Sequence, residues 1–272
     1  MKTRLVAWAV LSGLPAVAIA QDSDQWQFQV TPYLWLPTIG GDVNYEPPAG
    51  GGGGTAPGVD VGPTDWLDLL NGAALVNGSM RKGRFSMAAD FVWLSMESDK
   101  DNVKSLSDGT LVDVSLDLGT ETDLDGVTWT LVGGYTLWEE DRSIVDVIAG
   151  VRYFDLTVTT NWNLSVDITG PGGGVVLPAQ GSIESKTELW DGLVGVRGHF
   201  GLGESKWSVP FYLDAGTGDS ELTWQGMAGL AYSYHWGDLM LVYRHLFYNQ
   251  GDDGLLEDFS FTGPAFGARF RF

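Results

Sequence analysis

The chain has 272 residues, a formal net charge of −20 at pH 7 and no cysteine. Without cysteine it has neither a disulfide framework nor a lipid-modified N-terminus. The negative charge argues against nucleic acid as a partner, because nucleic-acid binding depends on Lys and Arg that contact phosphates.

The first twenty residues have the pattern of a secretory signal peptide. Lys2 and Arg4 precede an apolar run that ends in Ala-Ile-Ala at 18–20. This run is too short to span a bilayer as a helix, and no later stretch reaches about 18 uninterrupted apolar residues. We therefore expect residues 1–20 to direct export and residues 21–272 to form the mature protein. In a membrane, a chain without such helices has a closed β-barrel as its remaining option.

Ten later segments alternate apolar and polar residues over roughly the length that a tilted membrane strand needs. They are 26–37, 72–80, 84–96, 127–138, 144–158, 189–200, 207–215, 222–234, 239–248 and 259–272. In the first, Trp26, Phe28 and Val30 share one face, and Gln27 and Gln29 share the other. The pattern predicts an all-β, antiparallel, up-and-down transmembrane barrel of about ten strands, with eight strands as the alternative. A soluble β-sandwich would show the same alternation.

The connections between these segments are of two kinds. Short ones, at 81–83, 139–142, 201–206 and 235–238, alternate with longer or looser ones at 39–65, 97–126, 161–186, 216–221 and 249–258. Outer-membrane barrels have short periplasmic turns and longer extracellular loops, whereas a sandwich does not require this asymmetry. Alternation continues at 111–118 and 156–168, so we expect the strands there to project as a sheet beyond the membrane.

Several segments together resemble known membrane barrels. PYLWLP at 32–37, GVRYFDL at 150–156, LVYRHL at 241–246 and the terminal GARFRF, together with the signal, are similar to small outer-membrane β-barrel proteins of Gram-negative bacteria, the broad OmpA-barrel-like class. The resemblance implies a place in the outer membrane, contact with its lipid and lipopolysaccharide, and a C-terminal signal, Phe270 and Phe272, read by the barrel-assembly machinery. It implies no particular activity, because no motif identifies a characterised subfamily.

With the apolar faces outward, a defined polar set points into the lumen. Its predicted members are Asp90, Asp146, Arg152, Asp191, Arg197, His199, Asp214, Arg244, Arg269 and Arg271. All the basic members except the histidine are arginines, whose planar fork suits a confined carboxylate better than the point charge of lysine. A ten-stranded barrel is only slightly wider than eight-stranded barrels, which side chains fill. We therefore expect a charge-paired, mostly filled interior.

This interior favours a non-enzymatic, structural role in the envelope. One alternative is a narrow, gated channel, in which the ion pairs exchange partners and open a file of water. Another is a surface receptor or adhesin that acts through the projecting loops. The acidic loop at 97–125 could also attract divalent cations, although no calcium-loop spacing occurs.

The histidines argue against an enzyme. Outer-membrane proteases of the omptin type are also ten-stranded and carry acid and histidine groups at the extracellular rim. The three histidines here are His199 and His235, expected near the periplasmic edge, and His245, which shares an outward parity with Tyr243. No predicted outer loop contains a histidine, so we expect no catalytic residues, no metal site and no cofactor.

Overall fold

The computed structural model describes residues 25–43, 59–106, 113–170, 173–251 and 256–272. The expected signal peptide at 1–20 lies outside this part of the chain. Most of the described chain is β-strand. Within it, no helix has the length and apolar character that crossing a bilayer requires.

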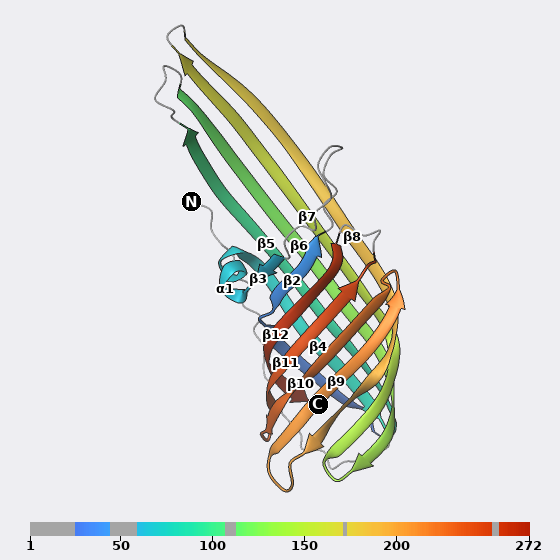
Figure 1. The fold of residues 1–272 in the computed structure, drawn as a ribbon. Coiled ribbons are helices and arrows are strands. Elements are labelled where there is room, and N and C mark those ends of the chain that lie inside the picture. The colour runs from blue at the N-terminus through green and yellow to red at the C-terminus, as the bar shows by residue number, and fades with distance from the viewer. Residues whose placement is uncertain (1–24, 44–58, 107–112, 171–172, 252–255) are drawn as a thin grey trace.

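Ten antiparallel strands close into a barrel (Figure 1). Their bounds are β1 Gln27–Trp35, β4 Leu70–Lys82, β5 Phe85–Leu106, β6 Asp113–Glu140, β7 Ser143–Gly170, β8 Gly173–Gly201, β9 Trp207–Gly218, β10 Leu222–Ser233, β11 Gly237–Asn249 and β12 Leu256–Arg271. Each pairs with the next in this series, and β12 pairs with β1 from Gln29↔Arg271 to Trp35↔Ala265, which closes the ring. The expected ten strands are confirmed, and the eight-stranded alternative is wrong.

The remaining elements lie between β1 and β4. They are β2 (Thr38–Val43), β3 (Val59–Val61), the one-turn helix α1 (Pro63–Trp66) and the 3-10 turn η1 (Leu67–Leu69). β2 continues along β12 beyond the end of β1, and β3 pairs with β2. The indole Nε1 of Trp66, a buried residue, donates a hydrogen bond to the carbonyl oxygen of Pro37 at 2.8 Å. This contact ties α1 to the chain just after β1.

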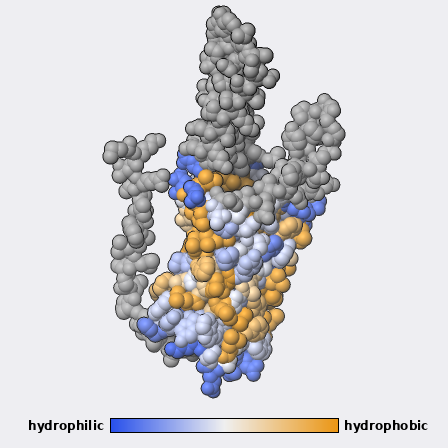
Figure 2. Space-filling model, turned by 60° about the vertical axis from the view of Figure 1, so that its left-hand side comes forward, coloured by the Kyte–Doolittle hydropathy of each residue, from blue (hydrophilic) through white to orange (hydrophobic). Residues whose placement is uncertain are grey.

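Alternate side chains of each barrel strand face outward and inward. On β5, Phe85 and Trp93 are 69% and 36% exposed, whereas Ser86 and Val92 are buried. The stretch from position 85 to position 93 has the length that a tilted membrane strand needs, roughly 9–11 residues. Figure 2 shows such apolar residues over the barrel wall, above a hydrophilic lower edge. The alternation therefore produces an apolar outer face and a separate interior.

The two ends of the barrel differ as the sequence predicted. Short turns join β4 to β5, β6 to β7, β8 to β9 and β10 to β11 at one end, called here the short-turn end. At the other, the long-loop end, β5, β6, β7 and β8 run on as a paired sheet far beyond the wall (Figure 1), which confirms the expected projection. Phe272 lies at the short-turn end, where the amide of Phe28 donates a hydrogen bond to its carbonyl oxygen at 3.1 Å.

Candidate functional site

The interior of the barrel is built in layers, which the inner face of β7 shows best. From the short-turn end this face presents Asp146, Ile148, Arg152 and Phe154, each at most 4% exposed. Polar and apolar layers therefore alternate along the lumen. All ten side chains expected inside lie on inner faces of their strands. The layers bring eight of them together in charged clusters, and Asp191 and His199 lie outside these clusters.

Asp146 is the centre of one cluster at the short-turn end. Its Oδ2 forms an ion pair with Arg81 and accepts a hydrogen bond from the Ser86 hydroxyl at 3.0 Å. Its Oδ1 accepts a hydrogen bond from the Thr136 hydroxyl at 2.8 Å. Arg197, the ladder partner of Asp146, places Nε 3.5 Å from the same carboxylate. Four side chains thus surround one carboxylate.

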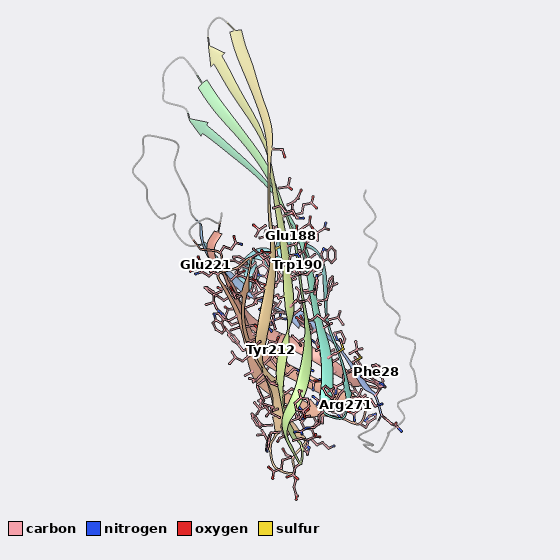
Figure 3. All side chains as sticks on the ribbon, turned by 90° about the vertical axis from the view of Figure 1, so that its right-hand side faces the viewer. Phe28, Glu188, Trp190, Tyr212, Glu221 and Arg271 are labelled. Carbon is pink, nitrogen blue, oxygen red and sulfur yellow. The ribbon has the colours of Figure 1, made fainter. Side chains whose placement is uncertain are left out.

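Asp238 holds the two C-terminal arginines at the same end. It forms an ion pair with Arg271, which Figure 3 shows at the lower end of the barrel near Phe28. Nη1 of Arg269 lies 3.7 Å from the other carboxylate oxygen. The Ser233 hydroxyl donates to Oδ1 at 2.7 Å. The carboxylate therefore bridges strands β10, β11 and β12.

Arg152 and Asp214 form the most deeply buried pair, with no exposed side-chain surface on either residue. Nη2 of Arg152 lies 2.5 Å from Oδ2 of Asp214. Nε and Nη1 of Arg152 donate to the hydroxyls of Thr130 and Thr223, each at 3.1 Å. A fully desolvated ion pair needs such additional partners, because the attraction alone barely repays the loss of hydration.

Arg244 is the second arginine of the middle layer. It lies 2.9 Å from the Asp90 carboxylate and donates to the Tyr33 hydroxyl at 2.9 Å and to Gln225 Oε1 at 2.8 Å. The Tyr33 hydroxyl in turn donates to Asp90 at 3.0 Å. The guanidinium also lies over the Trp35 ring, 4.4 Å from its centroid, which adds a cation–π contact. Arg244 thus joins the polar middle layer to the aromatic layer beyond it.

Apolar side chains separate and cover these polar layers. The smaller cluster lies around Ile148 and consists of Ala88, Val132, Ile148 and Leu193. The larger one fills the lumen toward the long-loop end and consists of Trp35, Phe154, Leu189, Val242, Leu246, Tyr248, Phe259 and Ala265. Its aromatic rings pack together; the Tyr248 and Phe259 centroids, for example, are 4.8 Å apart. Water entering from this end meets a packed hydrocarbon layer.

Asp191 is bound by a loop residue, Ser220, rather than by an arginine. It faces Arg152 in the β7–β8 ladder, yet no ion pair joins them in the described structure. Instead its two carboxylate oxygens accept hydrogen bonds from the amide and the hydroxyl of Ser220, both at 2.9 Å. Asp191 therefore holds the loop between β9 and β10 against the barrel.

Sequence reasoning missed two charged members of the short-turn clusters, Arg81 and Asp238. Both lie within the segments assigned to turns, whereas the structure extends β4 through Lys82 and begins β11 at Gly237. The signal was available, because each residue has the inward parity of its own strand. Extending the alternation by one residue into each turn would have found both.

The long-loop rim carries a small charged group. Lys186 lies 2.9 Å from Asp155 and 3.4 Å from Glu188, and the hydrogen bond and charge of Asp155, followed by those of Glu188, raise the pKa of Lys186. Figure 3 shows Glu188 at this upper rim. Exposed pairs of this kind contribute little to stability. In the described residues, no group of three or more His, Asp or Glu side chains is arranged to hold a metal ion.

The histidines lie apart from this rim. His199 is on the inner face near the end of β8, and His235 is exposed in the turn after β10. His245 is on the outer face, where its Nδ1 lies 2.5 Å from the Thr262 hydroxyl and its ring packs against Trp224. The outward parity of His245 predicted this position. Its hydrogen bond gives the imidazole a polar partner on an apolar wall.

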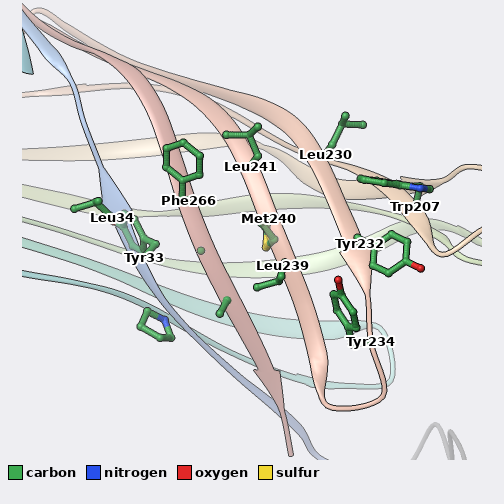
Figure 4. A pocket seen from close by; sticks show the side chains of 13 residues that line it. Tyr33, Leu34, Trp207, Leu230, Tyr232, Tyr234, Leu239, Met240, Leu241 and Phe266 are labelled. Atoms are coloured by element: carbon green, nitrogen blue, oxygen red, sulfur yellow. The ribbon is translucent and has the colours of Figure 1, made fainter.

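A groove of about 950 Å³ crosses the outside of the barrel over β1 and β9 to β12. Figure 4 shows its apolar lining, with Phe266, Leu241 and Leu34 on one side and Tyr232, Tyr234 and Trp207 on the other. Because it lies on the outer face, it offers no path through the lumen.

The fold is similar to that of solved outer-membrane proteins. The outer-membrane protease OmpT from Escherichia coli matches with a TM-score of 0.52 and 12% identity over 94% of this chain and 99% of OmpT. The attachment invasion locus protein Ail of Yersinia pestis matches at 0.28, with 10% identity over 92% and 99% of the two chains. The translocator domain of the autotransporter NalP from Neisseria meningitidis matches at 0.36, with 12% identity over 90% and 88%.

Of these three matches, the one to OmpT bears on the fold, and at 12% identity it bears on the fold alone. No protein-family model and no curated protein sequence matches the chain. The closed ten-stranded antiparallel barrel and its apolar outer band nevertheless agree with the class that the sequence resembles. The chain has the fold of the small outer-membrane β-barrel proteins of Gram-negative bacteria.

Proposed function

We propose that this protein is a non-enzymatic, closed barrel with a structural role in the bacterial outer envelope. The observation that carries the proposal is the burial of the Arg152–Asp214 pair in the middle of the lumen, beneath the aromatic layer around Phe154. A conducting path would have to hydrate this pair and part those rings. The absence of a histidine at the described long-loop rim supports a non-enzymatic role.

Export and membrane assembly belong to the same proposal. Residues 1–20 direct secretion, and Phe270 and Phe272 serve as the terminal signal for the barrel-assembly machinery. The outer faces then contact membrane lipid and lipopolysaccharide. The position of Phe272 at the short-turn end, paired with Phe28, supports a periplasmic location for this signal.

Planar-bilayer recording of the refolded protein tests the closed lumen, with Arg197→Ala recorded beside it. We expect no discrete conductance steps from protein whose folding is confirmed by heat-modifiable gel mobility. Steps whose size changes with Arg197→Ala would reject the closed barrel in favour of a gated channel.

The sheet formed by β5 to β8 favours a second candidate, a surface receptor or adhesin. These strands remain paired for up to 29 residues, far more than crossing a membrane requires. A variant with the projecting hairpins shortened should keep its barrel mobility. Unchanged attachment of cells expressing that variant to host or abiotic surfaces would reject this candidate.

A further inference from the structure

Positive charge exceeds negative charge inside the barrel at the short-turn end. Four arginines share two carboxylates there: Arg81, Arg197, Arg269 and Arg271 with Asp146 and Asp238. Arginine stays protonated in proteins. The middle layer has no such positive excess, since Arg152 is matched by Asp214 and Arg244 by Asp90. The excess of two positive charges is therefore local to this mouth of the barrel.

Arg197 and Arg269 are the least committed of the four. Their carboxylate contacts are long, 3.5 Å to Asp146 and 3.7 Å to Asp238, and neither donates a hydrogen bond to another described residue. Arg81 and Arg271, in contrast, form the short ion pairs with these acids. One guanidinium group in each cluster thus retains N–H donors that no other described residue accepts.

The two clusters lie next to each other in the strand register. Arg81 is the ladder partner of Gln27 on β1, and Arg271 is the ladder partner of Gln29, two positions further along the same strand. The side chains of Arg197 and Arg269 are 16% and 24% exposed, so they reach solvent only in part. Like charges in such a partly desolvated space repel strongly, and an anion among them would relieve that repulsion.

We propose that this mouth of the barrel binds a small oxyanion, of the phosphate or sulfate type, among Arg197, Arg269 and their neighbouring arginines. The guanidinium fork places two parallel N–H donors against two oxygens of such an anion. The charge of a dianion equals the local excess. The ligand would enter from the periplasmic side, either as a free ion or as the phosphate of a lipid headgroup.

Titration calorimetry with inorganic phosphate tests the site, using the full mature chain refolded in a non-ionic, phosphate-free detergent. We expect saturable binding of one phosphate and at least a tenfold weaker affinity in the Arg197→Gln/Arg269→Gln double variant. Lys206→Gln is the matched control, because it removes one positive charge from an exposed turn at the same end. Its affinity should equal that of the wild type.

Two further measurements complete the test. The wild-type thermal unfolding midpoint should rise more in phosphate than in chloride of equal ionic strength, a readout that requires no variant. Repeating the titration in nanodiscs that contain phosphatidylglycerol distinguishes the sources: phosphate binding that disappears there assigns the site to a lipid headgroup, and binding that persists assigns it to a free ion. No saturable binding by the wild type, or unchanged affinity in the double variant, would overturn the proposal.

Discussion

Arg152→Met should destabilise the barrel more than any change on its surface. The substitution removes the charge that neutralises Asp214 at a site where both side chains are fully buried. Removing one partner of a buried ion pair costs about 3–5 kcal/mol. The Thr130 hydroxyl also loses its contact, at about 1 kcal/mol, whereas Thr223 keeps its hydrogen bond to the Phe247 carbonyl. We expect the free energy of unfolding to fall by about 4–6 kcal/mol.

Urea unfolding of the refolded protein in micelles, followed by tryptophan fluorescence, measures this loss. With a slope of about 2 kcal/mol/M, the urea midpoint should fall by about 2–3 M. Arg142→Met is the matched control: the exposed Arg142 side chain contacts the Ser205 carbonyl between two turns. Its effect should stay within about 1 kcal/mol.

A double variant distinguishes the loss of the ion pair from the cost of leaving the buried Asp214 carboxylate unpaired. Arg152→Met combined with Asp214→Leu leaves no unpaired charge, and apolar replacement of a buried ion pair is often neutral. We expect the double variant to recover most of the stability. A loss below about 1 kcal/mol in Arg152→Met, or an equal loss in the double variant, would refute an uncompensated Asp214 charge as the cause.

Two further substitutions test strand approach and loop anchoring. A Cβ at Gly150 would lie 2.0 Å from the Leu131 carbonyl oxygen. Gly150→Ala should therefore lower the free energy of unfolding by about 1–3 kcal/mol, seen as a lower urea midpoint. Gly78→Ala, whose Cβ would meet nothing within 4 Å, should leave the midpoint nearly unchanged; equal effects would contradict the steric cause. Asp191→Ala removes both acceptors of Ser220, and amide exchange in the loop between β9 and β10 should rise about tenfold. Exchange as slow as in the wild type would show that Asp191 does not hold the loop.

Much of the fold could be predicted because strand alternation is a local property. Phe85 and Trp93, at odd positions of β5, face outward, and Ser86 and Val92, at even positions, face inward. The face of each residue therefore follows from its position in the strand. The contrast between short turns and long connections predicted the two ends in the same way. Strand ends were harder, since alternation does not mark the residue at which a strand gives way to a turn, and Arg81 and Asp238 were missed there.

The pairing of charges across the lumen was beyond such reasoning. Parity places Asp146, Asp191 and Asp214 inside, but it does not say which arginine reaches which acid. Asp214 meets Arg152, 62 positions away in sequence, whereas Asp191 turns to the Ser220 loop.

Closure of the barrel decides these contacts. When β12 pairs with β1, Tyr33 and Arg244, 211 positions apart, come within hydrogen-bond distance. Which side chains meet inside depends on the tilt and stagger of all ten strands together, quantities that no single strand contains. The alternating residues of each strand determine what enters the lumen, and the geometry of the closed ring determines which side chains meet there.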